Sequence, residues 1–239
     1  MIDKLLQIQK FNLLSSKKLN HFNATLPILI EVLKKTKTNH YLLMVGNKTL
    51  ETKSLKTLEV GGKYFALMKP LSTGGIMLTS LKSEPKIPKA PFGFDFEEFK
   101  KNFLDISKID QLQEYALDKI SQAQNKEDFL SWGFFLLGIQ RKILSFWIDQ
   151  DSKKTFCQIK MQKRELVFYA LFPHLGELNG RLYQNQGITL ELCVGYESVA
   201  SFLQEHQKLL EGIDRLDIRI DQRISPLFLP SEQLLDLKI

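Results

Sequence analysis

The side chains that most often bind metals or act in catalysis are few in this chain and widely spaced. They are four histidines and two cysteines: His21, His40, His174, His206, Cys157 and Cys193. Zinc sites and sites built from two histidines and a carboxylate bring their ligands together at characteristic spacings, which these residues do not show. The sequence therefore predicts neither a metal site nor a metal cofactor.

Sequence motifs for enzyme chemistry are also absent. There is no Gly-x-Ser-x-Gly, no phosphate loop with Gly-Lys-Ser and no Gly-x-Gly-x-x-Gly. Cys193 ends a strand-like run, but a nucleophilic cysteine needs a lowered pKa, and no base lies near it in the sequence. His174 lies in a loop, where a histidine is more often solvated than catalytic. We expect a protein that is not an enzyme and that uses no cofactor and no small-molecule substrate.

The most informative local feature is the turn Phe172-Pro173-His174-Leu175-Gly176, which lies between two strand-like runs. Pro173 fixes its own φ and ends the preceding strand. Leu175 can fill the edge of the sheet, and Gly176 can adopt a backbone conformation that other residues avoid. By themselves, these residues indicate a strand corner that redirects the chain.

Alternating apolar residues predict strands on both sides of this corner. The expected strands span residues 155–161, 166–171, 177–183, 188–194 and 214–221. Residues 197–211 have helical spacing instead, and Gly212 follows at a position where glycine commonly ends a helix. The pattern predicts a C-terminal α/β layer over residues 151–239, in which one helix packs on a small sheet.

The order of these features resembles the carboxy-terminal domain of flagellar hook-length control proteins. In that family Pro-x-x-Leu-Gly precedes a strand, and Pro173, Leu175 and Gly176 match it with one residue fewer in the spacer. An acid, Glu177, and an alternating strand follow, and then come Gln-Gly, a β run, a helix and a last apolar strand. The resemblance covers about residues 153–222, which is under a third of the chain.

This resemblance implies a non-enzymatic flagellar assembly protein of the type III export system. In the family, the carboxy-terminal domain contacts the cytoplasmic part of the export-gate switch protein and changes export specificity from hook to filament. The implied partner-binding residues are Pro173, Leu175, Gly176 and Glu177. Family members also carry a long disordered segment rich in Gln, Pro and Ser, which this chain lacks, so the resemblance implies a binding or switching role without length measurement.

The amino-terminal part, residues 1–82, has a different pattern. Apolar residues after Pro27 recur at helical spacing and predict a short helix: Ile28, Leu29, Val32 and Leu33. Four strands are then expected at 41–45, 49–55, 63–68 and 76–81, with turn glycines between them. The pattern predicts a small β-barrel-like domain, closed or half-closed, over roughly residues 25–82, similar in kind to oligonucleotide-binding barrels.

The distribution of charge suggests an alternative function for this amino-terminal part, which is nucleic-acid binding. Residues 1–91 hold 15 lysines and 5 acids, a net +10, whereas the remaining residues hold 18 basic and 22 acidic side chains, a net −4. A basic barrel can bind nucleic acid if aromatic side chains stack on the bases, and Tyr41, Tyr64 and Phe65 are the candidates. Such aromatic residues more often belong to a barrel core, and a surface of lysines without arginine is common on any solvated protein.

Between these parts we expect a linker and a helical segment. Pro85, Pro88 and Pro91 with several lysines predict an extended linker over residues 83–93. Three apolar stripes that begin at Phe96, Leu112 and Phe129 predict three packed helices within residues 94–150, the last of them capped by Asn125. The predicted fold class is therefore α+β.

The sequence also bears on location. Polar residues interrupt the most hydrophobic stretch, residues 129–148, and residues 1–12 lack the cleavage site of a secretory signal. Both cysteines lie in strand-like runs, which suits buried thiols in a reducing compartment. We expect a cytoplasmic protein that does not span the membrane, and the resemblance adds the possibility of export through the flagellar apparatus.

Overall fold

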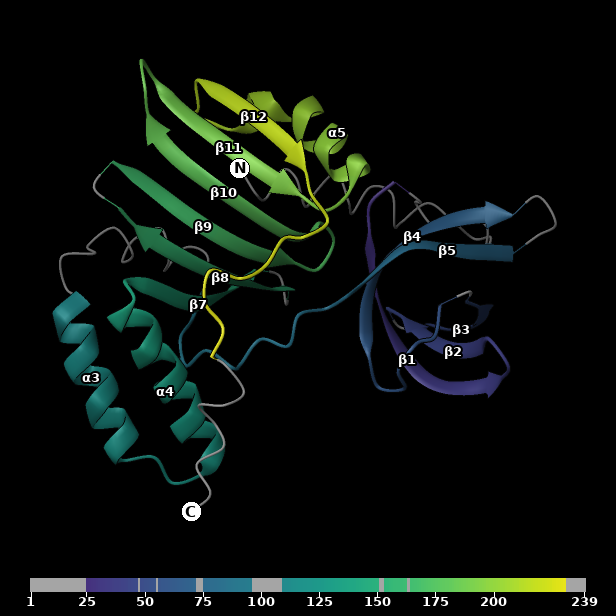
Figure 1. Cartoon of the computed structure of the whole chain (residues 1–239), viewed down its shortest axis with the longest axis horizontal. Helices are drawn as coiled ribbons and strands as arrows, with labels where there is room; N and C mark the ends of the chain where they lie inside the picture. Colours follow the sequence, from purple (N-terminus) through teal and green to yellow (C-terminus); the bar gives the residue numbers. More distant parts are fainter. Residues whose placement is uncertain are drawn as a thin grey trace.

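The computed structural model describes residues 25–46, 48–54, 56–71, 75–95, 109–150, 153–162 and 164–230. Two β-sheets, one of five strands and one of seven, make up most of the regular structure in these ranges (Figure 1). The helices of the described part are α3 (Ile109–Ser121), α4 (Lys126–Gln140) and α5 (Glu197–Glu205), and a short 3-10 helix, Gln207–Leu209, follows α5.

The five-stranded sheet has the order β3-β2-β1-β4-β5. Its strands are β1 (Ile28–Lys37), β2 (His40–Val45), β3 (Lys48–Lys53), β4 (Lys63–Leu71) and β5 (Gly75–Ser83). The four strands expected here are confirmed at nearly their predicted positions. The predicted barrel is wrong, because the described strands form an open sheet in which β1 lies at the centre and β3 and β5 are the edges.

The short helix predicted after Pro27 is also wrong, since these residues form β1, which pairs antiparallel with β2 and β4. Ile30 and Val32 are both 0% exposed, and the half-buried Glu31 lies between them, so burial alternates along the strand. Apolar residues at positions 28, 29, 32 and 33 fit the spacing of a helix as well as that of a strand. The β-branched residues and the pairing with two neighbouring strands favour the strand.

The seven-stranded sheet has the order β12-β11-β10-β9-β8-β7-β6. Its strands are β6 (Gly93–Asp95), β7 (Ile143–Gln150), β8 (Lys153–Met161), β9 (Glu165–Phe172), β10 (Gly176–Gln184), β11 (Ile188–Val194) and β12 (Arg215–Ile220). Neighbouring strands are antiparallel except for β6 with β7 and β11 with β12. The five strands predicted after residue 151 are confirmed, and α5 makes the crossover between the parallel strands β11 and β12.

The predicted helical segment over residues 94–150 is wrong in two places. Phe94 belongs to β6, and β7 replaces the end of the third predicted helix. Helix α4 ends at Gln140, and Lys142 then has φ of 61°, a left-handed conformation that turns the chain into β7. The stripe that begins at Phe96 lies outside the described residues. The predicted α+β class with a helical middle segment is therefore wrong: the described chain is mostly β, and the C-terminal sheet is larger than predicted.

Two segments without helix or strand connect and cover these elements. Residues 84–92 run from β5 to β6, and residues 221–230 leave β12 and cross the seven-stranded sheet toward α4 (Figure 1). The second segment is fixed by the Gln158 side chain, whose Nε2 donates to the carbonyl of Phe228 at 2.8 Å. In return, the backbone N–H of Phe228 donates to Oε1 of Gln158 at 3.2 Å.

One buried hydrophobic cluster spans both sheets, and the five-stranded sheet also has a core of its own. Phe65 of β4 belongs to the same buried cluster as Tyr169, Leu171 and Leu178 of the seven-stranded sheet. In Figure 1 the five-stranded sheet lies beside the end of the larger sheet at which β9 and β10 join. The predicted strand corner is therefore located where the two sheets meet.

Candidate functional site

The candidate site is the corner between β9 and β10. Residues 173–175 form a turn, and Gly176 pairs with Phe172 to begin the β10 ladder. Gly176 has φ of +74°, in the left-handed region that residues with a Cβ rarely adopt. The expectation of an unusual backbone conformation at this glycine is confirmed.

The requirement for glycine comes from the backbone, because packing at position 176 would allow a Cβ atom in ordinary contact. A Cβ atom added there would lie 3.4 Å from Cε2 of Tyr196, at the start of α5, and 3.9 Å from the ring of Phe65 in β4. Gly176 is buried between these two rings. Leu175 is half-buried and packs on the same core, whereas Pro173 and His174 are half-buried in the turn.

Glu177 lies at the start of β10, and its side chain points into the contact between the sheets. Directly paired residues share a face of a sheet, so Glu177, opposite Leu171, faces the same side as Tyr169. Its carboxylate is only 3% exposed. Burial of an ionised carboxylate is costly unless partners compensate the charge, and such partners are present.

Both carboxylate oxygens of Glu177 are occupied. Nζ of Lys82, from β5, lies 2.6 Å from Oε2, and the hydroxyl of Tyr169 donates to Oε1 at 3.1 Å. The same Lys82 ammonium donates to the carbonyl of Ile224 at 3.4 Å. Lys82 therefore joins the five-stranded sheet to β10 and to the C-terminal segment at one point.

The two tyrosines of the corner are strongly influenced by this environment. Burial raises the pKa of Tyr169, and the negative charge of Glu177 raises it further. The pKa of Tyr196 is raised by the same two causes in the same order. The Tyr196 hydroxyl is buried without a hydrogen-bond partner among the described residues. Both phenols stay protonated at neutral pH, and one still has an unused donor.

The four residues implied by the family motif thus lie together, as expected for consecutive positions. What the sequence did not indicate is that Gly176 and Glu177 are covered by the five-stranded sheet, through Phe65 and Lys82. Lys82 is one of 15 lysines in the first 91 residues, so no local pattern marks it. Phe65 lies in a strand pattern of the kind in which core aromatic residues commonly occur, so its sequence context does not mark it either.

The candidates for base stacking have other roles. Tyr41 and Phe65 are each 1% exposed, and the Tyr41 hydroxyl accepts a hydrogen bond from the N–H of Leu58 at 3.3 Å. Tyr64 is half-buried, and its hydroxyl accepts from the N–H of Glu59 at 3.0 Å. These three rings belong to the protein's own packing, so the nucleic-acid alternative is left with the lysines alone.

The cysteines and His174 show no sign of activation. Desolvation raises the pKa of the Cys157 thiol to about 12 and also raises the pKa of Cys193, so both sulfurs remain protonated thiols. Burial, together with the nearby charge of Lys153, lowers the pKa of His174. Within the described ranges, no group of three or more His, Cys, Asp or Glu side chains is arranged to hold a metal ion.

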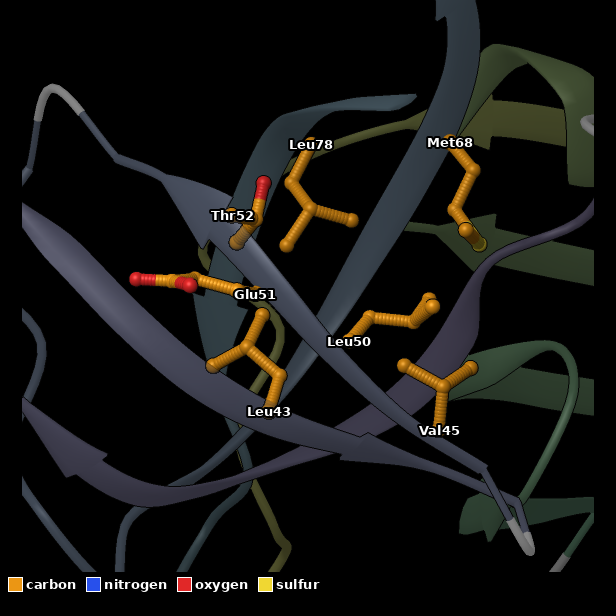
Figure 2. A pocket seen from close by; sticks show the side chains of 7 residues that line it. All are labelled: Leu43, Val45, Leu50, Glu51, Thr52, Met68 and Leu78. Carbon is orange, nitrogen blue, oxygen red and sulfur yellow. The ribbon is translucent and has the colours of Figure 1, made fainter. Parts of the chain in front are cut away.

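A cavity of about 170 Å³ lies within the curve of the five-stranded sheet. Figure 2 shows the residues of β2, β3, β4 and β5 that line it, with the Glu51 side chain extending away from the others: Leu43, Val45, Leu50, Glu51, Thr52, Met68 and Leu78. Its single carboxylate, Glu51, accepts a hydrogen bond from Oγ1 of Thr36 at 2.7 Å. An apolar lining with one engaged carboxylate has no set of converging polar groups for catalysis.

Comparison of the chain with protein-family models, with curated proteins and with solved structures finds no match. In the described part of the chain, no helix has the length and apolar character needed to cross a bilayer. Arguments about function therefore depend on the residues and contacts of the corner itself.

Proposed function

We propose that this protein is a non-enzymatic flagellar assembly protein that binds the type III export apparatus and influences its substrate specificity. The observation that carries the proposal is the order of elements around the corner. Strand β9, the turn, β10, β11, the α5 crossover and β12 follow the order that characterises the hook-length resemblance. The glycine that matches the family motif, Gly176, has the positive φ that explains a requirement for glycine.

The physical character of the corner favours binding over chemistry. Glu177 pairs with Lys82 and Tyr169, and the side chains packed around these groups are aromatic or aliphatic. Once exposed, such a set of side chains recognises another protein by shape and a single charge. We infer that the partner is the cytoplasmic domain of the export-gate switch protein, which is the partner implied by the resemblance. The protein would act from the cytoplasm.

The proposal is tested by measuring capture of the full chain on the immobilised cytoplasmic domain of the export-gate protein. We expect wild type to be enriched and Leu175→Asp, at the corner, to lose most of the enrichment. Leu78→Asp is the matched control, because Leu78 is also half-buried but packs in the five-stranded sheet away from the corner. Circular dichroism would verify that both variants fold. Failure of the wild-type chain to bind would refute the proposal.

A further inference from the structure

The corner surface of the seven-stranded sheet is occupied by the protein's own first sheet. A buried anion, Glu177, is neutralised by Lys82 of β5 at 2.6 Å, and the flat site over Gly176 is covered by the Phe65 ring of β4. Two features thus define what this surface accepts: a cation that reaches Glu177 and an aromatic ring beside it. Both are currently supplied by neighbouring strands of the five-stranded sheet.

Any partner that binds at the corner must replace both contacts. Removing the cation from a buried carboxylate is strongly destabilising, so displacement of Lys82 without a substitute is unfavourable. Exposure of the glycine site and of the apolar residues around it adds a further cost in proportion to the area uncovered. A binding partner at this surface therefore has to present a lysine or arginine next to an aromatic side chain.

We propose, on the basis of the function proposed above, that the corner is the partner-docking surface and that β4 and β5 occupy it as an internal competitor. The export-gate partner displaces them with its own cationic residue and aromatic ring, placed at Glu177 and Gly176. The first sheet then acts as a cover that keeps the docking surface closed until the partner is present.

Two further observations favour a cover that can be displaced. Lys82 is 25% exposed, so water and a competing cation can reach the ion pair from outside. The Tyr196 hydroxyl lies buried without a partner among the described residues. A buried hydroxyl without a hydrogen bond is destabilising, so the internal fit is imperfect where a partner can do better. Residues 84–92, which have no helix or strand, are the chain connection between the two sheets.

The test uses the full chain and two substitutions that open the same contact from opposite sides. Lys82→Met removes the internal cation and retains the length of the side chain, whereas Glu177→Gln removes the anion that both ligands need. We expect both variants to increase amide hydrogen exchange at residues 173–177 and 84–92 relative to wild type. Exchange in β2 and β3 should not change, which would exclude general unfolding.

Binding to the export-gate domain should then separate the two variants. Lys82→Met frees Glu177, so the apparent Kd should fall about tenfold, because a larger fraction of molecules is open. Glu177→Gln opens the corner but removes the anchor for the partner's cation, so its Kd should rise about tenfold. Lys86→Met is the matched control, because Lys86 is an exposed lysine four residues from Lys82 and should leave both measurements unchanged.

The outcomes distinguish this inference from the proposed function. If wild type binds, the inference is overturned by equal affinity of wild type and Lys82→Met, or by tighter binding of Glu177→Gln. If no variant binds the export-gate domain, the proposed function fails and with it the assignment of this partner. An increase in hydrogen exchange in Lys82→Met would in that case still show that the Lys82 contact holds the cover in place.

Discussion

Gly176 illustrates how a backbone conformation can require glycine at a single position. Its φ of +74° is unfavourable for any residue with a Cβ, although that Cβ would make only an ordinary contact of 3.4 Å with Tyr196. We predict that Gly176→Ala lowers the free energy of unfolding by more than about 1 kcal/mol, measured by urea denaturation. Gly195→Ala is the control, because an added Cβ there meets no atom within 4 Å. Equal midpoints for the two variants would contradict the assignment.

Tyr169 allows a prediction about pH. Its hydroxyl donates to Glu177 at 3.1 Å, so Tyr169→Phe should lower the free energy of unfolding at pH 8 by about 1–2 kcal/mol. Burial and the charge of Glu177 raise the pKa of Tyr169 in the folded protein. In the unfolded chain, a tyrosine ionises near pH 10. The stabilisation by Tyr169 is therefore complete below about pH 10 and is lost as pH rises above it.

The difference in stability between wild type and Tyr169→Phe should consequently shrink between pH 8 and about pH 10.7, by up to about 1 kcal/mol. Urea titrations of both proteins at the two pH values measure this difference. Other titrating groups are common to both proteins and largely cancel. A difference that stays constant or grows with pH would show that Tyr169 is not held in its protonated form.

At the scale of single residues, the sequence predicted those features that are determined by residues close together in the chain. Pro173, Leu175 and Gly176 make a corner through their own backbone preferences, and Asn125 caps α4 by accepting from the N–H of Asp128 at 2.9 Å. The Lys82–Glu177 pair depends on how two sheets dock, which no local pattern encodes. The covering of the candidate site was therefore outside the reach of sequence analysis.

Among the secondary-structure elements, the errors fall on short, dense apolar runs. Both β1 and β7 were predicted as helix, and in both the apolar residues are so close together that helical and strand spacing fit equally. Burial between two paired strands decided the outcome. The strands after residue 151 were predicted correctly, because turn residues separate the runs and, outside the apolar strand β9, polar residues alternate with apolar ones.

The C-terminal segment 221–230 shows how one side chain can fix an element that has no regular structure. Gln158 is fully buried in β8, and its amide makes hydrogen bonds with both backbone groups of Phe228, at 2.8 Å and 3.2 Å. Gln158→Leu would leave those groups without partners, at a cost of about 1–3 kcal/mol each. We predict lower stability and faster hydrogen exchange in residues 221–230. Cys157→Ala, at the neighbouring position of β8, should leave exchange of this segment unchanged.

For the molecule as a whole, the shared core makes the two sheets depend on each other. Phe65 of the first sheet is 1% exposed within the cluster that contains Tyr169 and Leu178. The proposed cover requires a contact that couples the sheets and that a partner can still displace. Such a balance predicts a single unfolding transition in the isolated protein, since opening one sheet uncovers apolar surface on the other.

The coupling can be measured because both tryptophans, Trp132 in α4 and Trp147 in β7, lie outside the first sheet. Leu43 is buried only in the separate core of that sheet, and Leu43→Ala should cost about 2–5 kcal/mol. If the sheets unfold together, this distant substitution lowers the urea midpoint seen by tryptophan fluorescence as much as the one seen by circular dichroism. Phe65→Ala should instead separate the two transitions, because it weakens the contact that joins them. If Leu43→Ala left the fluorescence midpoint unchanged, the two sheets would unfold independently. The contact at Glu177 would then not hold the first sheet closed over the corner.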